Sequence, residues 1–575
     1  MVNRIIKKGK EIFTSPQTSI LSAASVIMMM IVASRVLGLV RQRVLAHFFT
    51  ASQLGVFFAA FRLPDLVFEV LVFGTFSSAF IPVFTKLASR NQEDAWELAS
   101  KIVNIGLVIF LGLALTVGLS SDFLYQLIAP GFSAEYRDQI VSLTRILFLA
   151  QGFFVISYVL TGVLESLKRF LIPALAPIFY NIGIIVGTAV FAGKYGLLAP
   201  CFGVVIGAFA HFMIQLPLAI KLGFKFKPGM FIDDNVKKIG TLALPRIIEV
   251  GFLQFSKTAE LFFSSFLSTA SYAYYTFGNT IQLLPVGIFG TSIAKAALPT
   301  LSAKVDSKEE FAKALWKSLY ELTFLVTPIA GMLIVLRIPI VRLVFGTDIF
   351  TWESTVQTGL VVSSFAFGVV FQAANALLAR GFYAMHDTKT PVSVSVLTIL
   401  LTILLDFLFI KVFHTPIWGL ALAFSIGAFI QSTALYILIN KRVNGGFRIK
   451  NLAPFIKHLI ASLASGGLMF FVLKVFDKSV WVKRLSFLGK IEATRAINFQ
   501  KFVLDTNYTL NLLMLTIVVG LLGVGVYIFV SWLLKVKELR TFTNLIKRVF
   551  VFKKLGKLSV KEQEPVIPTP TETTN

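Results

Sequence analysis

The chain has 575 residues, of which 56% are hydrophobic and 14% are charged. A soluble protein of this length would need more charge to cover its domains, so the composition excludes a soluble enzyme, a secreted disulfide scaffold and a disordered protein. We therefore expect an all-α polytopic membrane protein. Its net charge of +25 is typical of membrane proteins whose cytoplasmic loops collect Lys and Arg, and it does not require a nucleic-acid partner.

Windows of about 20 apolar residues predict about fourteen transmembrane helices. The first window is too long for the core of a cleavable signal peptide, so we interpret it as the first span. In chain order the expected spans are 18–46, 55–86, 100–121, 142–167, 170–193, 196–221, 239–268, 270–302, 314–337, 355–385, 388–412, 416–440, 454–476 and 509–535.

Lys and Arg are distributed unevenly between the two ends of the predicted spans. They gather in the N-terminal segment, in the loops after every second span and in the segment that follows the last span. The positive-inside rule then places both termini in the cytoplasm. One loop, residues 477–508, is basic although this topology makes it external.

Two stretches, residues 61–87 and 277–301, share the pattern Phe-Gly-Thr, then Ser or Ala, then Pro. Their glycines lie 216 positions apart and their prolines 217, while a weaker similarity pairs Phe170 with Phe382. This favours an internal duplication over chance similarity between apolar segments. The offset covers six spans, so the two copies enter the membrane in the same direction, and the substrate site is expected between them. The expected units are a basic cytoplasmic N-terminus (1–17), an N-lobe (18–221), a C-lobe (222–440), a C-terminal helix pair (441–535) and a basic, then disordered, cytoplasmic tail (536–575).

Ionisable side chains inside the spans are the strongest functional signal, because an unpaired charge in the bilayer costs several kcal/mol. Span 7 carries Glu249, Lys257 and Glu260 on one helical face. They either line a cavity or form a Lys257–Glu260 pair inside the bundle. Lys257 follows Arg41 by 216 positions, so the duplication places one cation in each lobe and favours the cavity.

Three arginines, Arg35 and Arg41 in span 1 and Arg62 in span 2, are expected around this inter-lobe cavity. Guanidinium forks suit phosphate oxygens, so they predict an anionic head group as ligand. The alternative for Arg41 is that its side chain extends to the membrane interface.

Other polar residues give weaker signals. The scattered histidines and the single cysteine, Cys201, predict neither a metal site nor a disulfide. No nucleophile motif or phosphate-binding loop is present in the sequence, so we expect no enzyme and no cofactor. Asp387 and Lys389 lie where span 11 begins, and Asp387 either caps that helix or takes part in gating.

Seven strings, taken in chain order, together resemble the MurJ/MviN family of lipid II flippases. The strings are SRVLGLVRQRVLAHFF (34–49), FRLPDL (61–66), GTFSSAFIPVF (74–84), APGF (129–132), KRFLIPALAPIFYNI (168–182), LPVGIFGTSIAKAALPTLS (284–302) and GFYAMHDTKTPV (381–392). The resemblance implies two six-helix lobes and a C-terminal pair that forms a groove for a polyprenyl tail. It also implies alternating-access translocation of undecaprenyl-pyrophosphate-linked peptidoglycan precursor across the bacterial cytoplasmic membrane, for cell wall synthesis.

The family's functional positions match Ser34, Arg35, Arg41 and Arg62, which the resemblance therefore assigns to substrate binding. The partners it implies are the lipid-linked precursor and membrane lipids. We expect a monomer, and the resemblance implies that either the membrane potential or a coupling ion of unknown identity aids transport.

The sequence departs from the family pattern at several positions, so other functions stay open. Gly55 stands where the family often has Asp, Phe68 and Phe73 where it often has Arg and Glu, and Asn279 with Thr280 where it usually has an Asp-Arg pair. Lys257, Lys295 or Arg246 are candidates to replace the missing second-lobe arginine. The alternatives are a flippase for another polyprenyl-linked saccharide and a non-transporting membrane scaffold, whereas the arginines disfavour a cation antiporter.

Overall fold

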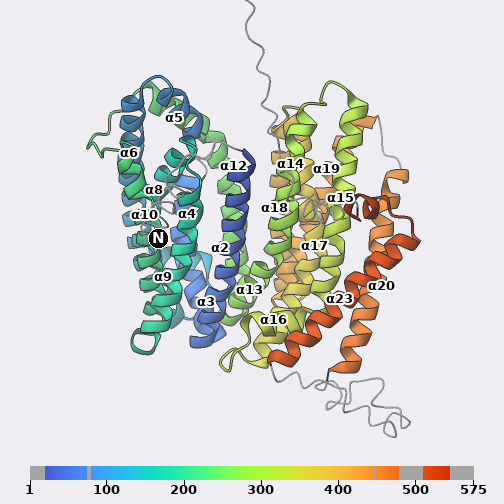
Figure 1. The fold of residues 1–575 in the computed structure, drawn as a ribbon. Helices are drawn as coiled ribbons and strands as arrows, with labels where there is room; N and C mark the ends of the chain where they lie inside the picture. Colours follow the sequence, from blue (N-terminus) through green and yellow to red (C-terminus); the bar gives the residue numbers. More distant parts are fainter. Residues whose placement is uncertain (1–19, 74–78, 445–448, 478–508, 544–575) are drawn as a thin grey trace, which may run out of the picture.

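In the computed structural model the described residues are 20–73, 79–444, 449–477 and 509–543. These residues form helices joined by short turns, with no β-strand among them, as Figure 1 shows. Each of the fourteen expected spans falls on a helix or a run of helices. The predicted all-α architecture is therefore confirmed. The basic loop at 478–508, whose side of the membrane the charge pattern left in conflict, lies outside the described residues.

The first half of the chain forms the N-lobe and leads into the connection to the second half. Its helices are α2 (Ile20–Phe48), α3 (Ala51–Ala60), α4 (Arg62–Phe68), the π-helical η1 (Glu69–Phe73), α5 (Ile81–Ala88), α6 (Gln92–Leu119), α7 (Ser121–Ile128), α8 (Ala134–Ser166), α9 (Leu171–Tyr195), α10 (Leu198–Met213) and α11 (Leu216–Lys221).

The second half forms the C-lobe and the C-terminal pair. Its helices are α12 (Asp234–Ser265), α13 (Thr269–Pro285), the π-helical η3 (Val286–Thr291), α14 (Ser292–Ser302), α15 (Lys308–Val335), α16 (Arg337–Phe345), α17 (Trp352–Ala384), α18 (Lys389–Phe407), η4 (Leu408–Val412), α19 (Trp418–Asn444), η5 (Ile449–Leu452), α20 (Ala453–Phe476) and α23 (Thr509–Leu533).

Eleven helices or helical runs among the described residues are long and apolar enough to cross a membrane. The other three expected spans fall on α2, on the broken run α3–α5 and on α12, the segments that carry the intramembrane charges. The total of fourteen spans therefore stays a prediction.

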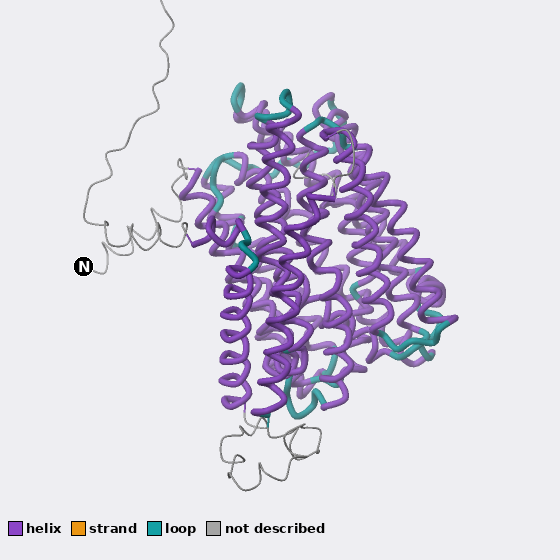
Figure 2. The backbone as a smooth tube through the Cα atoms, turned by 90° about the vertical axis from the view of Figure 1, so that its right-hand side faces the viewer, coloured by secondary structure: helices purple, strands orange, loops and turns teal. Residues whose placement is uncertain are grey.

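The two lobes stand side by side, with α2 and α12 between them (Figure 1). Most of the long helices run along a common direction in the perpendicular view of Figure 2. The C-terminal pair, α20 and α23, packs together on the outer side of the C-lobe, where α20 contacts α15.

Backbone features repeat between the lobes at a constant spacing and support the duplication. Lys168 and His386, 218 positions apart, both have positive φ in the turn between the fourth and fifth spans of their lobes. Gly196 and His414, also 218 apart, both have positive φ in the next turn. Left-handed backbone is uncommon for residues other than glycine, so its recurrence at matching turns is specific.

The duplication also recurs in the second span of each lobe. The π-helical segments η1 and η3 lie immediately before or across the two Phe-Gly-Thr motifs. The proposed pairing of Phe170 with Phe382 was wrong, because Phe170 precedes α9 whereas Phe382 lies inside the last turn of α17. The matching residue pair in that turn is Lys168 and His386.

Helices α9 and α10 pack closely through two interlocking Gly-x-x-x-Gly motifs. A Cβ atom added to Gly183 would lie 2.4 Å from Cα of Gly207, and one added to Gly187 would lie 2.4 Å from Cα of Gly203. Small residues allow helix backbones to approach in a membrane, where no hydrophobic effect drives helices together. This pair supports α2, which contacts α9.

Candidate functional site: a polar cavity between the lobes

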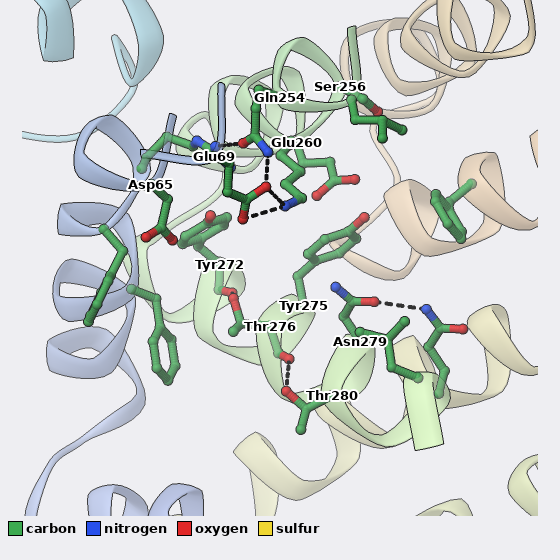
Figure 3. Close-up of a pocket in the computed structure, with 18 of the residues that line it drawn as sticks. Asp65, Glu69, Gln254, Ser256, Glu260, Tyr272, Tyr275, Thr276, Asn279 and Thr280 are labelled. Atoms are coloured by element: carbon green, nitrogen blue, oxygen red, sulfur yellow. Dashed lines mark hydrogen bonds and ion pairs between the residues drawn. The ribbon is translucent and has the colours of Figure 1, made fainter. Parts of the chain in front are cut away.

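A cavity of about 860 Å³ lies between the two lobes. One wall comes from α2, α3, α4, η1 and α9, and the other from α12, α13, α17, α18 and α19. Figure 3 shows side chains from both lobes directed into it. The cavity lies where the duplication places the substrate site.

Arg41 lines this cavity from α2. Its guanidinium carbon lies 6.0 Å from the ring centroid of Tyr180, and its Nε atom is buried without a hydrogen-bond partner. No carboxylate among the described residues forms an ion pair with Arg41. A half-buried arginine whose buried Nε–H has no partner is a strong candidate for binding an anion that enters the cavity.

Arg62 and Lys257 join the two lobes through a shared acid. Arg62, only 5% exposed, donates from Nη2 to the side-chain oxygen of Gln254, and the Gln254 amide donates to Glu69. Lys257 on α12 forms an ion pair with Glu69 on η1 at 3.0 Å. Figure 3 shows this chain of contacts at one edge of the cavity. Arg62 thus reaches a carboxylate only through an intervening amide, and its own Nε has no partner.

The cavity is not the uniformly cationic chamber that the sequence predicted. Three carboxylates, Asp65, Glu69 and Glu260, line it together with Arg41, Arg62 and Lys257. The prediction compared charges along single helices, where Glu260 was the natural partner of Lys257. In the structure Lys257 pairs across the lobe boundary with Glu69, and Glu260 forms no ion pair with any described residue.

Several predicted site residues lie outside this lining. Arg35 is exposed and its side chain lies against η3, where a Cβ added to Gly287 would come within 3.0 Å of Arg35 Nη2. Arg35 and Arg41 are six residues apart on one helix, about 240° around its axis, so they face different ways. The expectation of three arginines around one cavity is therefore corrected to two within the described lining.

The other predicted residues are placed as follows. Ser34 accepts hydrogen bonds from Asn181 on α9 at 3.3 Å to its backbone oxygen and 3.5 Å to its hydroxyl, and it does not line the cavity. Lys295 is exposed on α14 and is likewise outside the described lining. The side chain of Glu249 lies outside the described part of the structure, as does that of Arg246.

On α13 and α17 the C-lobe wall presents neutral amides where α4 of the N-lobe presents charges, while its own charged residues, Lys257 and Glu260, lie on α12. Asn279 lines the cavity and accepts a hydrogen bond from Gln282, which in turn accepts one from Gln372 on α17, both at 2.8 Å. Asn279 was predicted from the sequence, but the two glutamines were not. The duplication offset was the available signal, because it pairs Arg62 with Asn279 and Asp65 with Gln282.

The lobes are closed against each other at the end of the bundle where α2 ends and α3 begins, which we call the closed end. Helices α3 and α13 contact there so tightly that a Cβ added to Gly55 would lie 1.8 Å from the carbonyl oxygen of Thr269. Arg43 of the N-lobe donates to the carbonyl oxygen of Leu343 of the C-lobe at 2.6 Å. The absence of a side chain at position 55, one of the departures from the family pattern, is thus a condition for this closure.

At the opposite end of the C-lobe, Asp387 organises the start of α18. Its carboxylate accepts hydrogen bonds from the amide of Thr390 at 3.0 Å and from the Thr390 hydroxyl at 2.6 Å, and it forms an ion pair with Arg442 at 2.5 Å. Desolvation acts to raise the pKa of Asp387, but these hydrogen bonds and the Arg442 charge outweigh it and hold the pKa below its usual value. Lys389, the first residue of α18, is exposed.

A second cavity, of about 810 Å³, lies between α15, α17, α19 and α20. Its lining is predominantly apolar, with residues such as Leu319, Phe371 and Leu459. Helices α17 and α19 separate it from the central cavity: Phe371 and Phe429 face this apolar groove, while Gln372 and Ala428 face the central cavity. A polar chamber and an apolar groove on either side of shared helices suit an amphiphilic molecule.

Two duplicated helical lobes around a polar cavity, with an apolar groove beside it, define a polytopic membrane transporter. Comparison with known proteins specifies which one: residues 44–491 match the family described as "Lipid II flippase MurJ", and the chain belongs to that family. The resemblance drawn from the sequence motifs is thereby confirmed.

Individual relatives agree with this assignment. The lipid II flippase MurJ of Burkholderia cenocepacia is 26% identical over 460 residues, covering 77% of this chain and 88% of the relative. The probable lipid II flippase MurJ of Vibrio cholerae is 28% identical over 435 residues, covering 72% and 82%.

Solved structures share the fold. A structure described as "Lipid II flippase MurJ, inward closed conformation" superposes with a TM-score of 0.69 at 24% identity, covering 87% of this chain and 98% of that one. An inward-facing multidrug resistance MATE transporter of the MOP superfamily superposes with a TM-score of 0.59 at 13% identity, covering 72% and 95%. At these identities the likeness establishes the fold.

Proposed function

We propose that the chain is a lipid II flippase, which moves undecaprenyl-pyrophosphate-linked peptidoglycan precursor from the inner to the outer leaflet of the bacterial cytoplasmic membrane by alternating access of its two lobes. Family membership supports the cargo class. The observation that carries the mechanism is Arg41, which lines the inter-lobe cavity, has a buried Nε atom without a hydrogen-bond partner, and forms no ion pair in the described part of the chain.

Each part of such a cargo has a matching surface. Arg41 and Arg62 offer guanidinium donors to the diphosphate, whose oxygens accept paired N–H groups. The apolar groove beside α17 and α19 offers a path for the polyprenyl tail. The movement is transport without covalent chemistry, because binding one amphiphile from either side needs only a change in lobe orientation.

The membrane topology follows from the charge pattern. With both termini in the cytoplasm, the closed end faces outward, and the structure corresponds to a state in which the cavity receives cargo from the inner leaflet. The protein acts as a monomer in this proposal, because both cavity walls come from one chain.

A coupling ion completes the proposed cycle. The cavity carboxylates Asp65 and Glu260 are the groups that would bind a proton or a cation when the cargo leaves, keeping the empty cavity near neutrality. The identity of this ion is left to transport measurements with different ion gradients.

Complementation of a flippase-depleted bacterium tests the proposal. Arg41→Ala should abolish rescue at normal expression, and Arg41→Lys should rescue partially because it keeps the charge but loses the fork. The matched control is Arg137→Ala: Arg137 donates to the carbonyl oxygen of Phe132 at 2.8 Å and does not line the cavity. Full rescue by Arg41→Ala would overturn the diphosphate-binding role.

A non-transporting member of the family is the second candidate, favoured by the neutral C-lobe wall at Asn279 and Gln282. Reconstituted protein separates the two. A flippase moves fluorescent lipid II between leaflets of a vesicle, whereas a scaffold binds it without moving it. The same assay with a different polyprenyl-linked saccharide decides the cargo.

A further inference from the structure

A third cavity, of about 490 Å³, lies at the closed end and takes no part in the mechanism above. The last turns of α2, the loop after α16 and the first turn of α23 surround it. Its charged or titratable lining residues are Arg43, His47, Arg342 and Asp348. Arg43 belongs to the N-lobe and Arg342 to the C-lobe, so the cavity spans the lobe boundary.

Among the described residues, each of the two arginines donates hydrogen bonds to backbone carbonyls through Nη1 only, which leaves its other N–H groups available. Arg43 donates from Nη1 to Leu343 at 2.6 Å, and Arg342 donates from Nη1 to Phe350 at 3.0 Å. Within the described part of the chain, the Nε and Nη2 atoms of both side chains make no hydrogen bond, and neither arginine has an ion pair. Two guanidinium groups and one carboxylate, that of Asp348, line the cavity, so its charged side chains carry an excess of positive charge that favours an anion.

The loop after α16 is shaped around Arg342. A Cβ added to Gly346 would lie 2.6 Å from Cδ of Arg342 and 2.2 Å from its carbonyl oxygen. The adjacent Thr347 donates from its hydroxyl to the carbonyl oxygen of Ala46 at 2.7 Å, which ties this loop to the end of α2. The cavity wall is therefore set by specific backbone contacts.

The surroundings of the cavity are those of a lipid rather than of a soluble ion. Val44, Phe48 and Leu512 add apolar lining next to the arginines. Outside it, Val190 on α9 and Leu510 on α23 are each 64% exposed, as expected for side chains that face acyl chains. A molecule bound here thus meets two guanidinium groups, the side chains of His47 and Asp348, and three apolar side chains.

We propose that this cavity binds the phosphate of an anionic glycerophospholipid at the membrane face where the lobes are closed. The two guanidinium groups supply forked donors for the phosphate oxygens, and the exposed apolar surfaces of α9 and α23 flank the acyl chains. The site does not depend on the cargo proposed above, since it shares no lining residue with the central cavity.

Native mass spectrometry of the purified full-length protein tests the site. Phosphatidylglycerol is titrated against the wild type, against Arg342→Gln and against the control Arg337→Gln. Arg337 lies on the same helix and also donates to a backbone carbonyl, Ile334 at 2.8 Å, but does not line the cavity. We expect at least tenfold weaker binding of phosphatidylglycerol to Arg342→Gln and unchanged binding to Arg337→Gln.

Further arms distinguish the sources of phosphate. Phosphatidylcholine should bind more weakly than phosphatidylglycerol, and inorganic phosphate at millimolar concentration should not displace the lipid. Displacement by phosphate, or equal loss in both variants, would overturn a lipid site. If Arg342→Gln does not fold, Arg342→Lys replaces it. Unchanged binding of phosphatidylglycerol to both Arg342→Lys and Arg43→Lys would contradict the forked contact between guanidinium and phosphate. Lipid II transport by Arg342→Gln is measured in parallel, so that failure of this site and failure of the flippase function are recorded separately.

Discussion

The two lobes share an ancestry in sequence but present different chemistry to the central cavity. At positions 217 apart, Arg62 of the N-lobe corresponds to Asn279 of the C-lobe, and Asp65 corresponds to Gln282. The hydrogen bond to the fourth span of each lobe is retained, because Gln151 donates to Asp65 at 2.7 Å and Gln372 donates to Gln282 at 2.8 Å. The backbone frame is therefore kept while the charge is confined largely to one wall.

This difference assigns separate tasks to the two walls. Under the proposed function we expect Arg41 and Arg62 of the N-lobe wall to attract the anionic part of the cargo, since hydrogen bonds to charged groups contribute about 1.5–3 kcal/mol each. Neutral amides give the C-lobe wall directional contacts of about 0.5–1.5 kcal/mol, suited to the hydroxyl and amide groups of a saccharide or peptide. Substituting corresponding residues of the two lobes tests this difference.

The largest expected difference in lipid II transport is between variants of Arg41 and Lys257, the two cations that the duplication places at equivalent positions of the two lobes. Arg41→Ala removes a guanidinium without a described carboxylate partner, so lipid II transport should fall roughly 10- to 150-fold, the equivalent of one charged hydrogen bond. Lys257→Ala removes a cation already paired with Glu69 and should cost less than tenfold. Transport rates in proteoliposomes measure both.

The control for this pair is the double substitution Lys257→Ala with Glu69→Gln, which removes the ion pair as a unit. It should transport at least as well as Lys257→Ala alone, because no uncompensated carboxylate is left. Equal losses in Arg41→Ala and Lys257→Ala would show that the lobes contribute symmetrically, contrary to the comparison.

The next largest effect is expected on the free energy of unfolding, when glycines at the helix–helix contacts are substituted. Gly187→Ala places a methyl group against the backbone of Gly203, which only a separation of α9 and α10 relieves, so unfolding should become easier by about 1–3 kcal/mol. At the corresponding helix pair of the C-lobe, Gly427→Ala meets the hydroxyl of Thr402, a side-chain atom that can rotate. Gly427→Ala should therefore lower the free energy of unfolding less than Gly187→Ala does. Thermal unfolding of both variants in detergent measures the difference, and equal melting temperatures would contradict it.

A smaller effect is expected on the neutral wall. Asn279→Ala removes one acceptor for Gln282 and should lower transport only about threefold to tenfold, as for a neutral hydrogen bond. Asn279→Asp tests the sign, because a carboxylate on this wall would repel the diphosphate and should lower transport further. An effect of Asn279→Ala as large as that of Arg41→Ala would mean that the C-lobe wall also binds the charged part of the cargo.

Much of the fold could be predicted from the sequence because a bilayer imposes simple rules. Each apolar window falls on a helix or a run of helices, and the repeated Phe-Gly-Thr motif indicated the duplication. The Gly-x-x-x-Gly motifs of α9 and α10 could also have predicted the close packing of these two helices. Their spacing of four residues, Gly183 to Gly187 and Gly203 to Gly207, was the available signal.

The site was only partly predictable, because its contacts cross the lobe boundary. Helical periodicity related Lys257 to Glu260 on one helix, but the actual partner, Glu69, lies 188 residues earlier in sequence. Arg35 and Arg41 share a motif, yet six residues on a helix turn their side chains to different surroundings. The Arg43–Arg342 cavity joins positions 299 residues apart, for which a single sequence offers no signal.

The smallest expected effect compares the turns before the fifth span of each lobe. In the C-lobe, Asp387 accepts the amide of Thr390 and pairs with Arg442, whereas the corresponding N-lobe position is Arg169. The pKa of Asp387 is lowered on folding, so its stabilisation is complete above its unfolded value of about 3.8 and is lost as the pH falls through the lower folded value. Arg442 is 46% exposed, so the effect stays below about 1 kcal/mol. Hydrogen exchange at the start of α18, corrected for intrinsic rates, should accelerate severalfold below pH 4, while the start of α9 should not respond. Asp387→Asn should remove this pH dependence, and an equal response at both helices would assign it to general acid destabilisation instead.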